Sequence, residues 1–363
     1  MNRMLILGLL CFMYYLAFAQ TPTNDSHWQL KWQDNFDTFN TNIWVKADSV
    51  AREHAKEPQI YIGNQVWTSG GNLVIEWNNT PFICPTPPPD PHWICDTCVA
   101  GKKYNYRSGL IETKPFYNTQ FGYIEARIKL PFKRVGTKSW GFFPAFWTMC
   151  NIGSSCTTAG EIDIIEMFGG EYKEPNTLNT CIHRCYGDGC NNGNMSISHT
   201  YSDFDYTLWH TYAIEWNAMR IIWYLDGKVI RTTTNHQIVD PIRIILNFAI
   251  QSEKKYLPPT SPNYSAQMLV DYVKVYCLKC DKNAVVTKIT DFNNYNYAVK
   301  KSISLDNQTT IPANSNITLR ATDFIELKPG FEVQTGRELY LDVTPCETCV
   351  PIMEAAIILD GVE

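Results

Sequence analysis

Three carboxylic side chains, Glu161, Asp163 and Glu166, lie within six residues of one another in an isoleucine-rich segment. In a regular strand, residues 161 and 163 share one face and Glu166 lies on the other. One inserted residue at Ile164-Ile165, a β-bulge, returns Glu166 to the face of the other two acids, and bulges are enriched beside active sites. We therefore expect three acids on one concave surface, where repulsion and desolvation raise at least one pKa.

Such a cluster of acids has two chemical uses. A retaining glycosidase needs a nucleophilic carboxylate and a second, acid/base carboxyl group about 5–5.5 Å away. Alternatively, three carboxylates suit a calcium ion. A merely solvated acidic strand is disfavoured because isoleucine alternates with the acids. The residue types alone leave glycoside hydrolysis and calcium binding open.

The elements that must position these acids are short strands. Apolar and polar residues alternate with period two, or run continuously apolar, in the segments 71–77, 122–130, 212–216, 221–225, 242–250 and 270–276. This pattern predicts an all-β fold, a two-sheet sandwich over residues 28–278. After Cys280 tryptophan disappears and short β-branched runs recur, which predicts a second, smaller stacked β module over 283–345, followed by a tail over 346–363.

The catalytic segment resembles the bulged Glu-x-Asp-x-x-Glu signature of glycoside hydrolase family 16, the laminarinase, agarase and carrageenase group. Further matches to the family, in its order, are found at residues 32–37, 122–127, 143–147, 209–216 and 270–276. Together they cover about 250 residues. The resemblance implies a β-jelly-roll catalytic domain and a retaining mechanism. More weakly, the C-terminal runs resemble a small β module of secreted Bacteroidetes enzymes.

The resemblance also implies roles for individual residues. Glu161 corresponds to the nucleophile, Glu166 to the acid/base, and Asp163 to the residue that orients the nucleophile. Trp147 and His183 correspond to substrate-binding residues of the cleft, with a structural role as the alternative for each. We expect Trp140 to bind substrate as well. His210 is expected to be structural, and Arg127 and Glu125 to form a buried pair.

Two departures from the family pattern concern metal and substrate. Asn35 stands where the family often has a metal-binding glutamate, which weakens the structural calcium that Asp271 otherwise suggests. No cofactor is expected to be required, and a structural calcium stays possible. After Ala249 the chain has Ile250-Gln251, where many laminarinases have two glycines, so the substrate is less certain than the chemistry.

The N-terminus predicts export. Arg3 precedes an apolar stretch over 4–18, and Ala17-Phe18-Ala19 is a cleavage site, so residues 1–19 form a signal peptide. We expect a secreted, cell-surface or periplasmic protein without stable membrane insertion, because the stretch is shorter than the roughly 20 residues that span a bilayer. The net charge of −5 argues against a nucleic-acid partner. The expected partner is a polysaccharide, and the expected state is a monomer.

Thirteen cysteines, twelve of them after the signal peptide, predict disulfides in an exported protein. We expect loop staples within Cys150/Cys156 and within the trio Cys181, Cys185 and Cys190. The alternative is a zinc site built from the Cys-x-x-Cys pairs, which are Cys95/Cys98, Cys277/Cys280 and Cys346/Cys349.

The sequence favours a retaining endo-β-1,3-glucanase of the laminarinase type. A sulfated galactan would call for basic side chains in the cleft, and residues 140–170 contain neither lysine nor arginine. A galactan hydrolase, a transglycosylase and a non-catalytic glycan-binding protein remain the alternatives. Binding relatives lose one or more of the three carboxylates, and this chain keeps all of them.

Overall fold

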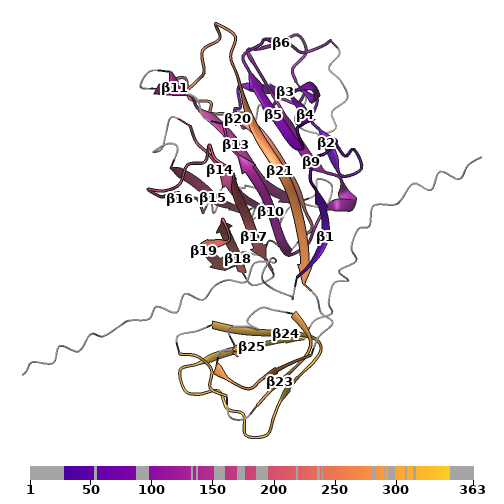
Figure 1. The fold of residues 1–363 in the computed structure, drawn as a ribbon, viewed down its shortest axis with the longest axis vertical. Helices are drawn as coiled ribbons and strands as arrows, with labels where there is room; N and C mark the ends of the chain where they lie inside the picture. Colours follow the sequence, from indigo (N-terminus) through magenta and orange to yellow (C-terminus); the bar gives the residue numbers. More distant parts are fainter. Residues whose placement is uncertain are drawn as a thin grey trace, which may run out of the picture. The chain divides into compact units, whose positions relative to one another are not determined.

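The structure is a computed structural model, shown in Figure 1. It describes residues 28–343 apart from short gaps, which are 53–54, 87–97, 132–133, 136–137, 151–159, 170–175, 185–194, 218–219, 235–237, 239, 279–282, 290, 293–298, 307–308 and 314–315. The predicted signal peptide and the predicted tail over 346–363 lie outside the described residues.

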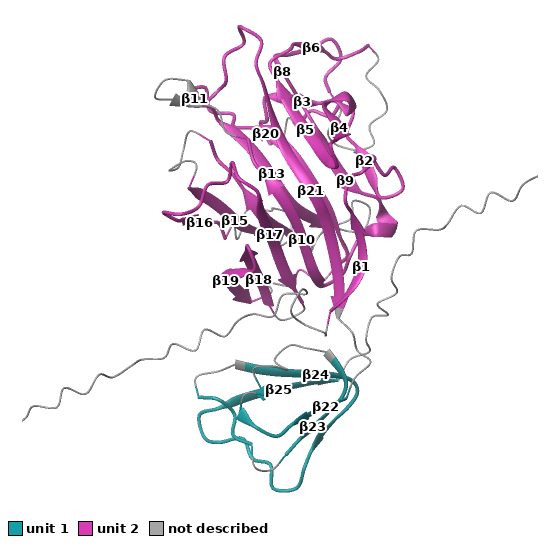
Figure 2. Ribbon diagram, viewed as in Figure 1, with its two compact units in different colours: residues 1–25, 280–346 teal, residues 26–279, 347–363 magenta. Residues whose placement is uncertain are grey.

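The chain divides into two units, residues 26–279 and residues 280–346, coloured separately in Figure 2. The larger unit contains two extended sheets. In hydrogen-bonding order, the first consists of β19 (Lys228–Thr234), β18 (Arg220–Leu225), β17 (His210–Trp216), β10 (Gly122–Lys129), β21 (Ser265–Leu278), β5 (Asn72–Asn78), β8 (Tyr106–Ser108) and β3 (Gln59–Tyr61), with β1 (Trp28–Asp34) on β21 and β4 (Val66–Ser69) on β5.

The second sheet carries the acidic segment. Its order is β16 (Ile197–Thr200), β15 (Thr177–Arg184), β14 (Gly160–Glu166), β13 (Phe142–Cys150), β20 (Ile242–Ile250), β9 (Leu110–Thr113) and β2 (Trp44–Lys46). Short elements complete the unit: the pairs β6 (Phe82–Ile83) with β7 (Lys103–Tyr104) and β11 (Arg134–Val135) with β12 (Lys138–Ser139), and the 3-10 turns η1 (Gly63–Gln65) and η2 (Pro115–Tyr117).

The sheets form because their strands carry the predicted periodicity. In β17 the alternate residues Tyr212, Ile214 and Trp216 are fully buried in the core. Every residue of β20 is buried, as its continuous apolar run predicts. These contacts confirm the predicted all-β fold of the larger unit. Among the described residues, no helix has the length and hydropathy needed to cross a bilayer.

The smaller unit has its own sheet and its own core. The strands β22 (Asn283–Val286), β23 (Val299–Leu305), β24 (Asn316–Leu327) and β25 (Glu338–Val343) pair in parallel in that order. Alternate side chains of β22, β23 and β24 pack inward, including Val286, Ile303 and Leu319. Parallel pairing of successive strands is the arrangement expected of stacked β rungs.

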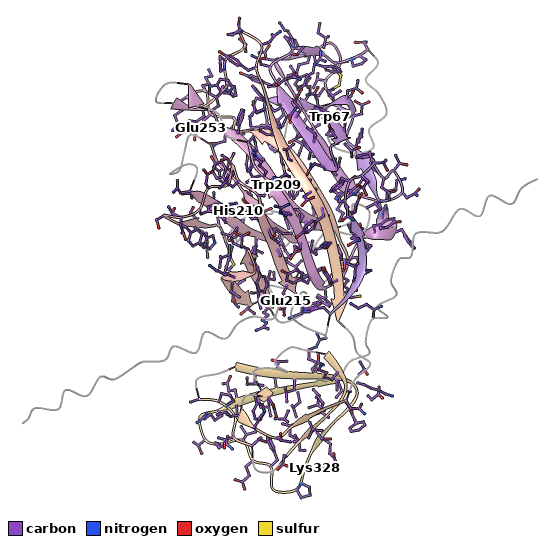
Figure 3. All side chains as sticks on the ribbon, in the orientation of Figure 1. Trp67, Trp209, His210, Glu215, Glu253 and Lys328 are labelled. Atoms are coloured by element: carbon purple, nitrogen blue, oxygen red, sulfur yellow. A yellow bond between two sulfur atoms is a disulfide. The ribbon has the colours of Figure 1, made fainter. Side chains whose placement is uncertain are left out.

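Two predicted ionic interactions differ in the structure. Arg127 does not pair with Glu125. Its guanidinium donates to the Asp271 carboxylate at 2.6 Å and lies over the ring of Trp209, which Figure 3 labels. Glu125 instead accepts hydrogen bonds from Tyr272 and Tyr123. A cation at Asp271 would have to compete with this guanidinium, so the residues present do not favour the expected calcium there.

The cysteines also correct part of the prediction. Cys84 and Cys98 form a disulfide, and Cys277 is disulfide-bonded as well, so a zinc site that uses Cys98 or Cys277 is wrong. Cys150 and Cys181 are buried thiols, so the expected staples that contain them are wrong. The other cysteines of the prediction, which are Cys95, Cys156, Cys185, Cys190, Cys280, Cys346 and Cys349, lie outside the described residues.

Candidate active site

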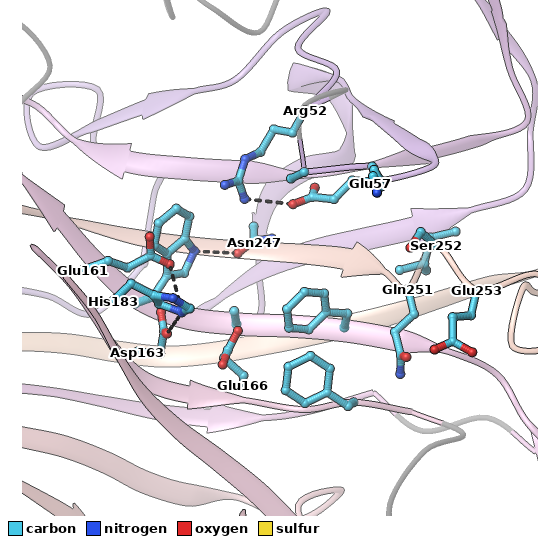
Figure 4. Close-up of a pocket in the computed structure, with 17 residues that line it drawn as sticks. Arg52, Glu57, Glu161, Asp163, Glu166, His183, Asn247, Gln251, Ser252 and Glu253 are labelled. Atoms are coloured by element: carbon cyan, nitrogen blue, oxygen red, sulfur yellow. Dashed lines mark hydrogen bonds and ion pairs between the residues drawn. The ribbon is translucent and has the colours of Figure 1, made fainter. Parts of the chain in front are cut away.

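A pocket of about 340 Å³ opens on the sheet formed by β15, β14, β13 and β20 (Figure 4). Its lining includes Arg52, Lys56, Glu57, Phe143, Ala145, Trp147, Glu161, Asp163, Glu166, Phe168, His183, Asn247 and Gln251. The three acids of the sequence motif therefore reach one pocket.

A β-bulge in β14 brings the third acid into the pocket. Asp163 pairs with Cys181 of β15 and Glu166 pairs with Asn179, so three steps on β14 match two steps on β15. The register against β13 shifts at the same place. The inserted residue returns Glu166 to the face of Glu161, as the sequence predicts.

The two isoleucines of the bulge pack in the hydrophobic core. Ile164 and Ile165 are both buried in the main hydrophobic core, on the side away from the pocket. The backbone carbonyl of Asp163 accepts a hydrogen bond of 2.9 Å from the indole nitrogen of Trp223, which lies on β18 of the other sheet. A buried carbonyl beside an irregular pairing needs such a donor. The opposite sheet thus holds the bulge in place.

His183 joins two of the acids. Its Nε2 atom lies 3.0 Å from Asp163 Oδ2 and 3.9 Å from Glu161 Oε1 (Figure 4). Positions 161 and 183 are directly paired across β14 and β15, which explains the approach. Burial alone would lower the pKa of His183, but hydrogen bonds to Asp163 and Cys181 outweigh it and raise that pKa to about 12. These partners therefore favour the protonated form of the imidazole in the acidic pocket.

Burial and the neighbouring Asp163 raise the pKa of both glutamates. Burial, followed by the charge of Asp163, raises the pKa of Glu161 to about 8, while His183 and Arg52 oppose that rise. Burial and Asp163 also raise the pKa of Glu166 well above its ordinary value. A pocket that contains one carboxyl able to ionise near neutral pH and another held protonated has the two states that acid/base chemistry requires.

A hydrogen-bonded chain fixes the indole of Trp147 in the pocket. Its Nε1 donates to Asn247 Oδ1 at 2.8 Å, and the amide of Asn247 donates to the hydroxyl of Tyr61 at 2.9 Å. Tyr61 in turn donates to Glu57, which forms an ion pair of 2.8 Å with Arg52. The Arg52 guanidinium lies 5.1 Å from the centre of the Trp147 ring, so both the edge and the face of the indole are held.

Aromatic rings also line the pocket on the side of Glu166. Phe143 and Phe168 stack with ring centroids 4.5 Å apart. Phe143, Ala145 and Trp147 alternate on one face of β13, and Ala145 pairs with Glu166. The small side chain of Ala145 leaves room beside the carboxyl group between two aromatic surfaces.

Five of the predicted site residues come together in this pocket: Glu161, Asp163, Glu166, Trp147 and His183. The prediction for Trp140 is wrong, because its indole packs in the core against Trp77, Phe142 and Tyr264 and does not line the pocket. His210 lies outside the pocket, as expected of a structural residue, and pairs with Asp226 at 2.7 Å.

Sequence reasoning missed the wall formed by Arg52 and Glu57. These residues precede β3, more than 100 positions before the acidic motif, and no spacing rule links the two segments. Their signal was the alternation of Glu57, Gln59 and Tyr61, which hydrogen-bond to one another. Arg52 and Lys56 also place cationic side chains in the pocket. The absence of basic residues from 140–170 therefore does not describe the whole pocket.

The model of "Glycosyl hydrolases family 16" matches residues 64–251, more than half of the chain. The chain belongs to this family. The match includes β13, β14, β15 and β20, which carry the three acids, His183 and Trp147, but it does not include Arg52 and Glu57. It does not extend to the smaller unit, and no subgroup of the family follows from it.

Individual relatives agree with the family. The chain is 29% identical over 229 residues to "Endo-1,3-1,4-beta-glycanase EglC" of Rhizobium meliloti, which covers 59% of this chain and 45% of that protein. It thus spans less than half the length of EglC. It is 26% identical to a "Beta-glucanase" of Rhodothermus marinus, over 69% of this chain and 85% of the relative. The endo-beta-1,3-glucanase structure from Pyrococcus furiosus superposes with a TM-score of 0.57 at 26% identity, over 69% of this chain and 95% of that one.

Proposed function

We propose that this chain is a retaining endo-β-glucanase whose preferred substrate is a β-1,3-glucan. The single observation that carries the proposal is the bulge in β14, which brings Glu161 and Glu166 into one pocket with Asp163 between them. The names of the relatives, an endo-1,3-1,4-beta-glycanase, a beta-glucanase and an endo-beta-1,3-glucanase, support the substrate class.

In the proposed mechanism, the carboxylate of Glu161 attacks the anomeric carbon and forms a covalent glycosyl ester. Glu166 donates its proton to the glycosidic oxygen as the bond to the leaving sugar breaks. The resulting Glu166 carboxylate then takes a proton from water, and the hydroxyl attacks the ester. This releases the sugar with its original anomeric configuration and restores both carboxyl groups.

The other pocket residues support these steps without exchanging bonds with the substrate. Asp163, held by His183, places a negative charge beside both glutamates and helps to keep Glu166 protonated. Trp147 is only 4% exposed, so its fixed indole gives the pocket a small apolar surface that a sugar ring can contact.

The experiment that tests the roles of the two glutamates is substitution by glutamine. Glu161→Gln should lower kcat by at least about 10³-fold, and Glu166→Gln by about 10²–10⁴-fold, because each removes a group that acts in the transition state. Glu215→Gln is the matched control, because Glu215 lies on β17 outside the pocket and should leave turnover nearly unchanged. Near-normal turnover of either pocket variant, with unfolding temperatures preserved, would contradict the assignment.

Substrate and stereochemistry need separate measurements. Release of reducing sugar should be fastest on laminarin when lichenan, agarose, porphyran and carrageenan are assayed in parallel. Proton NMR of the earliest products should show the retained configuration, whereas inversion would end the two-step mechanism. Products longer than the substrate would indicate transglycosylation, and binding without turnover would indicate a glycan-binding protein.

A further inference from the structure

A buried thiol lies directly beneath the acidic pocket, in a position that the proposed mechanism does not use. Cys181 is 1% exposed and lies on β15, two residues before His183, so both side chains point to the same face of the strand. It is the direct cross-strand partner of Asp163. A thiol, an imidazole and a carboxylate therefore converge at one place on the sheet.

These three groups lie at distances that suit a metal ion. One ligand atom each from Asp163, Cys181 and His183 can be chosen so that all three lie within 4.8 Å of one another. Even at that limit, a common point lies about 2.8 Å from each atom, so shifts of about 0.5–0.8 Å reach zinc–ligand distances. The Asp163–His183 contact of 3.0 Å is already close to the edge of about 3.3 Å between nitrogen and oxygen ligands of tetrahedral zinc.

We propose that Asp163, Cys181 and His183 form a binding site for a thiophilic divalent cation of the Zn²⁺ or Cd²⁺ class. The ligand types exclude calcium and magnesium as preferred occupants, since those ions take oxygen ligands. The ion binds the thiolate of Cys181 and the neutral imidazole of His183, so binding releases the proton of each into solution. The fourth position faces Glu161, whose Oε1 lies 3.9 Å from His183 Nε2.

The bound ion acts as an inhibitor of the glucanase. Coordination takes Asp163 and His183 away from each other, and these are the residues that set the charge around Glu161. Glu161 faces the fourth position, so its carboxylate can coordinate the ion and is then unavailable as the nucleophile. The inference goes beyond the proposed function, because it concerns an ion that glycoside hydrolysis does not need.

The experiment titrates the metal-free full-length chain with Cd²⁺ and follows the ultraviolet sulfur-to-cadmium charge-transfer band alongside calorimetry. We expect one equivalent to bind with the band present, and Cys181→Ser to abolish the band and weaken binding by tenfold or more. Cys150→Ser is the matched control, because Cys150 is the other buried thiol of the described residues, lies outside the pocket, and should leave the band unchanged.

Two results would overturn the proposal: a wild-type chain that binds no Cd²⁺ with a sulfur band, or a Cys181→Ser variant that folds normally and binds as tightly as wild type. If that variant fails to fold, the wild-type titration still decides, together with protection of Cys181 from alkylation by Cd²⁺ in the full chain. Hydrolysis of laminarin by the chelator-treated enzyme tests the glucanase proposal separately. A failure of the metal-site proposal can therefore be distinguished from a failure of the glucanase proposal.

Discussion

The charge on His183 sets the ionisation of the proposed nucleophile. Glu161 must be ionised to attack, so kcat/KM should rise with pH through its pKa of about 8, which His183 lowers against the effects of burial and Asp163. Glutamine keeps a hydrogen-bonding side chain but carries no charge. We therefore expect His183→Gln to raise the pKa of Glu161 and to move the acid limb of the kcat/KM profile to higher pH. A limb that stays in place would show that His183 is merely structural.

Asp163 should have the opposite effect. Its negative charge raises the pKa of Glu161 and of Glu166, second only to burial in each case. Asp163→Asn should therefore move both limbs of the kcat/KM profile to lower pH, as well as reducing its maximum. Because the two glutamates titrate together, neither limb of the profile reports the pKa of one residue alone. Both limbs of the variant are therefore compared with both limbs of wild type. Shifts of the two variants in the same direction would contradict this electrostatic account.

The sequence predicts the acidic residues of the pocket better than its aromatic residues. Glu161, Asp163 and Glu166 could be assigned because three carboxylates within six residues have few uses and only one geometry brings them together. Trp140 was misassigned because an indole suits a core as well as a cleft, and only the packing against Trp77 decides between them. The partner of Asp271 is Arg127, 144 positions away, and no local pattern specifies that pair.

The bulge is the element on which the site depends, and the opposite sheet anchors it. Trp223→Phe removes the indole donor to the Asp163 carbonyl and leaves that carbonyl buried. We expect a loss of about 1–3 kcal/mol in the free energy of unfolding from the missing hydrogen bond, with a further loss for the smaller ring. We also expect a lower kcat, because the relaxed bulge no longer aims Glu166 into the pocket.

Trp44→Phe provides the control for this prediction. The Trp44 indole is equally buried and also donates a hydrogen bond, to Asp34, but it lies on β2, outside the pocket. Thermal unfolding should show destabilisation in both variants, whereas kinetics should show a loss of kcat only in Trp223→Phe. Equal losses of kcat in the two variants would show that the hydrogen bond to the bulge has no specific role in catalysis.

Hydrophobic patterning predicted β5, β10, β17, β18, β20 and β21, and the spacing of the three acids predicted the bulge within β14. It could not predict which strands become neighbours. The pocket wall that contains Arg52 and Glu57 comes from a segment that reaches the acids only because β20 places Asn247 between Trp147 and Tyr61. Such contacts depend on the order of strands in the sheet. That order is set by interactions along the whole chain, so a short segment of sequence does not predict it.

The two units of the molecule have separate cores, and this separation allows a test of how catalysis is distributed. The core of the larger unit contains strands of both extended sheets, whereas that of the smaller unit draws its residues from 284–321. Every lining residue of the pocket lies between Arg52 and Glu253, within the larger unit. No described pocket residue belongs to the smaller unit.

Deleting residues 283–363 should therefore leave the hydrolysis of a soluble β-glucan oligosaccharide within about twofold of the full chain, because each active-site contact lies outside the deleted region. Calorimetry should still show cooperative unfolding of the larger unit at nearly the same temperature, since its core loses no side chain. The control is the same deletion combined with Glu166→Gln, which should be inactive. A truncated chain that unfolds cooperatively yet hydrolyses nothing would mean that the smaller unit contributes to catalysis. Catalysis would then not be confined to the larger unit.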